Sequence, residues 1–489
     1  MQAFKYLWLC LLCAAAFQSS AQSSPRERIN FDANWKFHFG HAANPEKDFN
    51  YGITTIFSKS GGAAQTAIDP RFKDSTWRSL NLPHDWAVEL PFVYKDNFDV
   101  MAHGYKPVGG HFPETSIGWY RKHFRVSPAD SSQRFQIQFD GVFRNAQVWI
   151  NGFYLGTNAS GYIGMAYDIT DFINYHRDNV IVVRVDATQY EGWFYEGAGI
   201  YRHVWLNKYQ NTHIATDGIF AHTNFQGNTT TVQVESTLAN ENTQNSICTL
   251  KTYLQDRAGK LVGVPKEQTI TLSANSEQIL KHSIPLSNPH LWSLEDPYLH
   301  RLVVEVRSNG KLLDKQSIRY GIRKIEIKPD GVFLNGESIK LYGVNCHQDH
   351  AGVGSALPDH LQFYRIALLK NMGTNAYRSS HNAPTPELLD ACDSLGMLVM
   401  DEQRLLNSGP EYMGQFERLV KRDRNHASVF MWSIGNEEGW IHTTSHGKRI
   451  AQTYIAKLKQ LDPTRTCTYA ADLANVYKGI NEVIPVRSF

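Results

Sequence analysis

An apolar segment that ends in acidic residues constrains the fold of this chain more than any other feature. Residues Val429 to Ile434 form a largely apolar, β-branched and aromatic run, and such a run is typical of a strand buried on both faces. Gly435, Asn436, Glu437 and Glu438 follow directly. Catalytic groups of parallel barrels lie at the C-terminal ends of the strands, so the segment predicts a barrel with Glu437 as a catalytic acid. Alternatively, Glu437 and Glu438 only open the next helix, where acidic side chains suit the helix dipole.

Strands and helices alternate in the sequence after Ile327, and this alternation predicts a parallel (β/α)8 TIM barrel. In the first expected helix, four apolar residues fall on one face: Leu361, Tyr364, Leu368 and Met372. The expected elements are strand 339–344, helix 358–372, strand 374–377, helix 386–395, strand 397–400, a helix around 416–420, strand 429–434, a helix around 450–461 and strand 466–469.

The residues around the apolar segment resemble the acid/base signature of glycoside hydrolase family 2, the family of β-galactosidases and β-glucuronidases. The positions that fill this signature are Asp423, Arg424, Asn425, His426, Ala427, Ser428, Trp432, Asn436 and Glu437. Residues 375–381 resemble a second signature of the family, although Asn382, Ala383 and Pro384 stand where it usually continues with Tyr-Pro. The resemblance implies a glycosidase in which Glu437 is the general acid/base.

The resemblance also implies roles for polar residues at the other strand ends. His347 and His381 would bind the sugar in the glycone pocket. Arg378 would brace the catalytic carboxylates, and Asn436 would hold the 2-hydroxyl of the sugar. These residues follow different strands, and the C-terminal ends of parallel strands converge on one site.

Two further sets of residues at the strand ends have a less direct interpretation. Asp401 and Glu402 end the third strand, and we expect them to anchor the substrate-binding residues. His347, Asp349 and His350 include types of residue that bind zinc. Because neighbouring residues at a strand end need not point the same way, we expect neither a metal nor a cofactor here.

The sequence before the barrel indicates two β domains. Short strands with turn signals, such as Asn151-Gly152, predict a β-sandwich over residues 26–209. Several of its segments, including 197–202, resemble the sugar-binding jelly roll of the same family; that segment is either a packed domain corner or a sugar contact. Residues 210–323 predict an immunoglobulin-like sandwich, and residues 324–489 the barrel.

The proposed chemistry needs a second carboxyl group. A retaining glycosidase places two carboxyl groups about 5–5.5 Å apart, one as acid/base and one as nucleophile. Partial burial would favour the protonated Glu437 that the first step requires. In the family, the nucleophile is a glutamate at the end of strand seven, so we expect it beyond Phe489 and the barrel to be truncated before that strand. Glu482 precedes an apolar run and is not a candidate.

These features favour a retaining exo-β-glycosidase that hydrolyses terminal β-galactosides of oligo- or polysaccharides. A β-glucuronidase and an inactive carbohydrate-binding fragment remain alternatives. With 49 basic and 47 acidic residues, the nearly neutral chain gives no electrostatic indication of nucleic-acid binding. Residues 1–21 predict a cleaved signal peptide and export, because their apolar run is shorter than the ~20 residues of a membrane span. The sequence does not determine the oligomeric state, and a homo-oligomer is one possibility.

Overall fold

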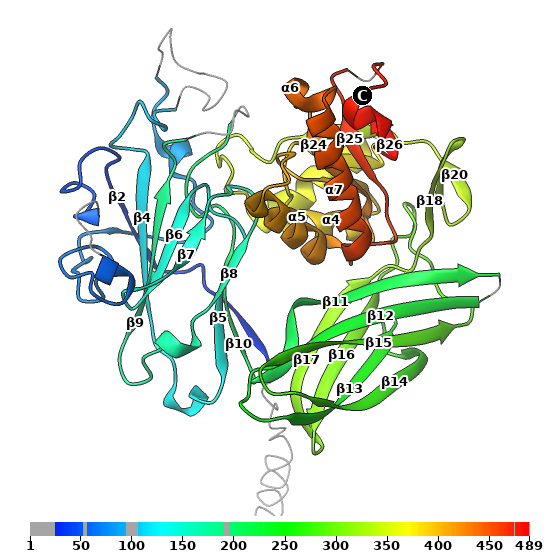
Figure 1. The fold of residues 1–489 in the computed structure, drawn as a ribbon, viewed down its shortest axis with the longest axis horizontal. Helices are drawn as coiled ribbons and strands as arrows, with labels where there is room; N and C mark the ends of the chain where they lie inside the picture. Colours follow the sequence, from blue (N-terminus) through cyan, green and yellow to red (C-terminus); the bar gives the residue numbers. More distant parts are fainter. Residues whose placement is uncertain are drawn as a thin grey trace, which may run out of the picture.

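The computed structural model shows three domains, drawn in Figure 1 with the first β domain on the left, the second below and the barrel at the upper right. The jelly roll, the immunoglobulin-like sandwich and a partial TIM barrel confirm the predicted fold class. The predicted signal peptide, residues 1–21, lies outside the described part of the chain. None of the described helices has the length and apolar character needed to cross a membrane. The structure describes residues 25–51, 56–93, 106–189, 195–227, 229–473 and 475–488.

The jelly roll consists of two antiparallel sheets, in the orders β1-β10-β5-β8 and β3-β2-β4-β9-β6-β7. Aromatic side chains such as Trp35, Tyr120 and Phe139 fill the core between the sheets. Asn151 and Gly152 have positive φ angles and form the predicted hairpin turn between β6 and β7. The strands are β1 Glu27–Asn30, β2 Trp35–Phe39, β3 Arg78–Leu80, β4 Ile117–Phe124, β5 Arg134–Phe139, β6 Ala146–Ile150, β7 Phe153–Asn158, β8 Met165–Asp168, β9 Asn179–Asp186 and β10 Val204–Tyr209.

The immunoglobulin-like domain packs the sheet β11-β12-β15 against the sheet β14-β13-β16-β17. Alternate residues of its strands face the core, as the period of two in their sequences predicts. A small antiparallel sheet, β18-β19-β20, leads into the barrel. The strands are β11 Thr212–Gln226, β12 Thr229–Asn240, β13 Ser246–Gln255, β14 Leu261–Leu272, β15 Ser276–Leu286, β16 His300–Ser308, β17 Lys311–Tyr320, β18 Ile325–Lys328, β19 Gly331–Leu334 and β20 Glu337–Ile339.

The barrel sheet contains six parallel strands in sequence order, β21 to β26. All eight residues of β24 are buried, which confirms the prediction for the apolar segment. Thr385 caps α4, Pro386 begins it and Gly396 ends it in the left-handed conformation, as the sequence predicts. The elements are β21 Gly343–Cys346, α3 Asp359–Asn371, β22 Ala376–Ser379, α4 Pro386–Leu395, β23 Leu398–Glu402, α5 Pro410–Asp423, β24 Val429–Asn436, α6 Gly439–His442, α7 Ser445–Leu461, β25 Cys467–Ala470 and β26 Val486–Ser488.

Two sequence predictions for the start of the barrel are wrong. The expected strand 339–344 is divided between β20 and β21, because the Tyr342 N–H donates to the Asn375 side chain (2.7 Å) instead of to a neighbouring strand. In α3, the apolar face expected to be buried is largely exposed: Tyr364 is 56% exposed and Met372 75%. Gln362 and Ile366 lie on the buried face instead, because α3 packs on α4 with that side.

Candidate active site

The C-terminal ends of neighbouring parallel strands bring together most of the predicted site residues. Arg378 lies in β22, Glu402 ends β23, and Asn436 ends β24. Because these three strands are adjacent and parallel, their ends meet at one edge of the sheet. The side chains of the three residues are joined there by direct hydrogen bonds.

Glu402 is the centre of this hydrogen-bond network. Its carboxylate is fully buried and accepts from Arg378 Nε (2.7 Å) and from the Ser433 hydroxyl (2.7 Å). His381 Nδ1 lies 2.7 Å from its other oxygen. A buried carboxylate needs such charged partners, because its desolvation is otherwise strongly unfavourable. Glu402 therefore fixes the Arg378 and His381 side chains, in agreement with the anchoring role predicted for it.

Only one of the two polar side-chain atoms of Asn436 has a hydrogen-bond partner among the described residues. Its side-chain oxygen accepts from Arg378 Nη2 at 2.7 Å. Its amide nitrogen is buried and has no hydrogen-bond partner among the described residues. A buried donor without a partner is unfavourable, so it needs an acceptor from outside the protein. A sugar hydroxyl is such an acceptor.

His347 and His381 pack edge to face, with ring centroids 5.7 Å apart. Burial, and next the nearby His381, lower the pKa of His347 below its ordinary value. The pair thus presents imidazole groups beside the Glu402 network. The structure brings together four predicted residues: His347, Arg378, His381 and Asn436.

Glu437 lies directly after this network, and its side chain is exposed. The partial burial that would favour its protonated form is therefore not seen in the described part of the chain. Arg378, expected to brace the catalytic carboxylates, binds Glu402 and Asn436. The main chain of Glu437 is strained, with φ of 55°, and is held by its N–H bond to Ala470 O at 3.0 Å. The strained turn leaves the carboxylate open to solvent at the strand end.

Glu438 has the opposite environment from Glu437. It is buried, and one of its carboxylate oxygens accepts from the Leu406 N–H at 3.3 Å. Burial raises the pKa of Glu438 to about 7. It occupies the N-cap position of α6 but makes no side-chain capping bond. The two acidic residues therefore do not simply cap the next helix.

The other carboxylate of the third strand, that of Asp401, makes no hydrogen bond to the Glu402 network. Asp401 is buried, and burial and nearby Asp423 raise its pKa well above the usual range. Among the described residues, the groups of metal-binding side chains within 4.8 Å do not include His347, Asp349 and His350.

The jelly roll contacts the barrel loops next to the site. Arg202 donates to Gln348 Oε1 (2.8 Å) in the loop after β21, and to Ala383 O (2.7 Å) after β22. Asp85 accepts from the Ser355 N–H at 2.9 Å. The segment 197–202 therefore forms a packed corner between the domains.

Sequence reasoning gave no role to Ser433 or Asp85. Ser433 lies inside the apolar run of β24, where a small polar residue is easily taken for a core position. Its place three residues before Asn436 was the available signal, because side chains near a strand end can reach neighbouring strands. Asp85 is 270 residues from its partner Ser355, and the sequence contains no signal for such a contact.

Three consecutive parts of the chain match descriptions of one family. Residues 63–210 match the sugar binding domain of glycosyl hydrolases family 2, and residues 212–323 match glycosyl hydrolases family 2 itself. Residues 325–409 and 407–486 match the TIM barrel domain of the same family. These matches span all three domains of the structure.

Individual relatives agree with these matches. A β-galactosidase, BoGH2A of Bacteroides ovatus, is 37% identical over 87% of this chain and 48% of its own length. A putative β-glucuronidase of Formosa agariphila is 33% identical over 95% of this chain and 41% of its own length. A crystal structure of a glycosyl hydrolase family 2 member from Bacteroides cellulosilyticus has a TM-score of 0.80 and 32% identity, over 91% of this chain and 56% of that one. The chain spans about half the length of the curated relatives it matches.

Proposed function

This chain belongs to glycosyl hydrolases family 2. We propose that it acts in the hydrolysis of terminal β-galactosides and that Glu437 is the general acid/base. The observation that carries the proposal is the buried network of Glu402, Arg378 and Asn436 directly before Glu437. The unpartnered amide of Asn436 lies next in sequence to the exposed carboxyl group of Glu437. The amide would hold a sugar hydroxyl, and the carboxyl group would deliver a proton.

In the proposed retaining mechanism, Glu437 first gives its proton to the glycosidic oxygen as the bond to the anomeric carbon breaks. A second carboxylate attacks the anomeric carbon and forms a covalent glycosyl ester. Glu437, now ionised, takes a proton from water as the water oxygen attacks the anomeric carbon. The bond from that carbon to the second carboxylate breaks, which frees the sugar and restores the carboxylate. The proposal assigns only the proton-transfer role to a residue of this chain.

A β-glucuronidase is the second candidate, because the similar protein from Formosa agariphila is named a putative β-glucuronidase. A panel of aryl β-glycosides distinguishes the two when it is given to a chain extended through strand eight of the barrel. Faster turnover of the galactoside supports the first candidate, and faster turnover of the glucuronide supports the second. If the extended chain binds a non-hydrolysable thio-β-galactoside but hydrolyses no member of the panel, the carbohydrate-binding alternative holds.

The acid/base role is tested with the leaving group. In Glu437→Gln of the extended chain, we expect hydrolysis of a β-galactoside with an alkyl or sugar leaving group to fall about 10²–10⁴-fold, because that group leaves only with a proton. A dinitrophenyl β-galactoside needs no proton, so its first step should change little. Glu482→Gln is the matched control, because Glu482 lies away from the network and pairs with Lys448. Equal losses for both substrates would contradict the assignment.

We also propose that the chain is exported, on the basis of the signal pattern in residues 1–21. Cell fractionation and N-terminal sequencing test this. A mature chain that begins near residue 22 outside the cytoplasm is expected. A cytoplasmic chain that retains residues 1–21 would contradict it.

A further inference from the structure

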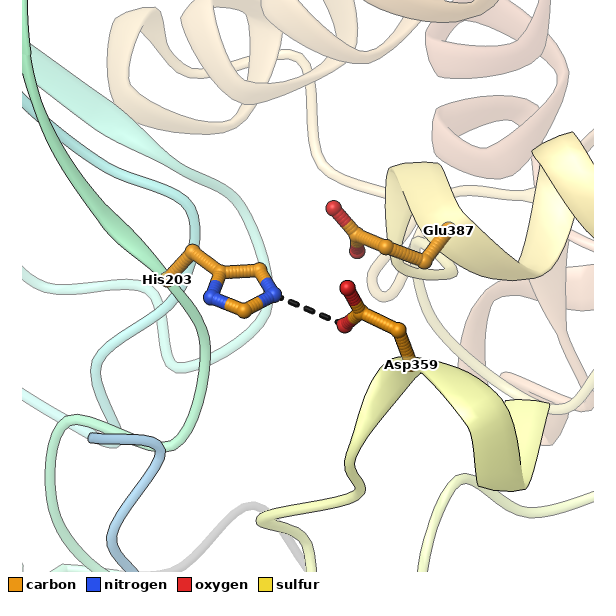
Figure 2. A group of neighbouring side chains, drawn as sticks. All are labelled: His203, Asp359 and Glu387. Carbon is orange, nitrogen blue, oxygen red and sulfur yellow. Dashed lines mark hydrogen bonds and ion pairs between the residues drawn. The ribbon is translucent and has the colours of Figure 1, made fainter. Parts of the chain in front are cut away.

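Three side chains that can bind metal ions meet at the joint between the jelly roll and the barrel. His203 directly precedes β10, Asp359 is the first residue of α3, and Glu387 lies in the first turn of α4. One ligand atom from each lies within 4.8 Å of the other two. Figure 2 shows the three side chains pointing toward one another from separate elements. The group is separate from the network around Glu402.

A fourth residue fixes the direction of the His203 ring. Asp32 Oδ2 lies 2.6 Å from His203 Nδ1, and Nε2 is thereby turned toward Asp359 Oδ1 at 2.8 Å. Asp32 itself accepts from Asn30 Nδ2 (2.7 Å) and from the Val204 N–H (2.9 Å). Metal-binding histidines commonly donate their second ring nitrogen to a carboxylate in this way, which orients the ring and strengthens the ligand.

Charged groups surround this joint. Three carboxylates, of Asp32, Asp359 and Glu387, surround one imidazole. The Glu387 carboxylate is half-buried, accepts from its own backbone N–H and also faces the Arg202 guanidinium. The types of ligand and their spacing, and not a surplus of negative charge, therefore favour an ion here.

Two alternatives must be weighed against a bound cation. The positive helix ends at Asp359 and Glu387 oppose a cation, but each by only about 0.3–1 kcal/mol. An imidazolium held between Asp32 and Asp359 would account for the two short contacts of His203 without any metal. In that arrangement His203 makes no hydrogen bond to Glu387, whose carboxylate points at the same place.

We propose that His203, Asp359 and Glu387 bind a divalent transition-metal ion, best matched by zinc. One nitrogen and two carboxylate ligands suit zinc, whereas Ca²⁺ and Mg²⁺ prefer oxygen ligands only. With zinc–ligand bonds of about 2.1 Å in a tetrahedron, the ligand atoms lie about 3.4 Å apart. Ligand atoms already within 4.8 Å reach this spacing by side-chain rotation alone. Asp359 is exposed, which leaves room for ion entry and a water as fourth ligand.

Such an ion would join the jelly roll to two barrel helices. Because the site exists only when the domains are docked, binding stabilises the docked state in proportion to the logarithm of the zinc concentration. The bound ion takes the position of the proton that His203 shares with Asp359. This role does not depend on the glycosidase activity.

The test uses the full chain, freed of metal with a chelator and titrated with zinc chloride in a calorimeter. We expect one zinc ion per chain and a higher thermal midpoint with zinc. Glu387→Gln keeps the size of the side chain and should weaken binding about tenfold or more and abolish the thermal shift. Asp390→Asn is the matched control: Asp390 also lies in a carboxylate and histidine group, but Arg319 already neutralises it.

Each other result contradicts the proposal. It is wrong if zinc does not bind, if it binds Glu387→Gln and the unchanged chain equally, or if Asp390→Asn weakens binding as much as Glu387→Gln. Tighter binding of Ca²⁺ than of zinc would contradict the ligand assignment. Circular dichroism of each variant shows that lost binding is not lost folding.

Discussion

Two buried carboxylates, Glu402 at the strand ends and Asp85 at the domain joint, differ in the groups that surround them. Glu402 is bound by the charged Arg378, by the imidazole of His381 and by one hydroxyl. Asp85 accepts from neutral groups only: the N–H groups of Ala87, Ala198 and Ser355, and the Tyr195 hydroxyl. Burial raises the pKa of Asp85, which shows that its neutral donors do not fully offset its desolvation.

The difference shows what each carboxylate organises. Glu402 orients side chains, namely those of Arg378 and His381 at the C-terminal ends of the barrel strands. Asp85 orients main chain, because three of its donors are backbone N–H groups from three separate segments. Charged partners thus mark the candidate active site, and backbone partners mark the contact that holds the domains together.

The largest effect is expected at Glu402. Glu402→Gln removes the charge that balances Arg378, and an uncompensated buried charge costs about 3–5 kcal/mol. Urea unfolding should show this loss in the barrel, and binding of a thio-β-galactoside should weaken with it. Asp178→Asn, in an exposed ion pair with Arg125, is the control and should change stability little. A stable variant with unchanged sugar binding would mean that Glu402 does not organise the site.

Glu438 lies beside this network, and we expect it to make the stability of the folded protein depend on pH. Its pKa is raised in the folded protein from 4.5 to about 7, so folding favours the protonated form. The corresponding stability is present below pH 4.5 and is lost as the pH rises through 7, by about 3 kcal/mol in total. Glu438→Gln should match the unchanged chain near pH 5 and exceed its stability near pH 9. Parallel pH profiles for the two proteins would contradict this.

The sequence predicts elements whose signals are local. The apolar run of β24 and the caps of α4 at Thr385 and Gly396 lie where expected, because burial on both faces and capping leave marks within a few residues. The face of α3 was predicted wrongly, because packing on α4 overrides the apolar pattern. The site residues could be named from the family resemblance, but the Glu402 network and the Asp85 contact depend on distant segments. Such contacts cannot be predicted from a local sequence pattern.

A smaller effect is expected at Asp85. Asp85→Asn keeps one acceptor oxygen but turns an amide N–H₂ toward backbone donors, which leaves buried groups unpaired at about 1–3 kcal/mol. Because the donors belong to both domains, the loss should appear as faster proteolysis at the joint and a lower thermal midpoint. Sugar binding should change less than in Glu402→Gln. Equal damage to sugar binding would show that the two carboxylates do not have separate roles.

The smallest expected effect is on stability, and it compares two buried serines, one with a hydrogen-bond partner and one without a partner among the described residues. Ser433→Ala removes one hydrogen bond to the Glu402 carboxylate but leaves Arg378 paired, so we expect a loss of about 1.5 kcal/mol in the free energy of unfolding. Ser236 on β12 is the matched control, because it is also buried but its hydroxyl has no partner among the described residues. Ser236→Ala removes an unsatisfied group and should be neutral or slightly stabilising. If urea unfolding shows the same change for both serines, the hydroxyl of Ser433 does not support Glu402. Charge pairing with Arg378 and His381 would then suffice to hold the carboxylate.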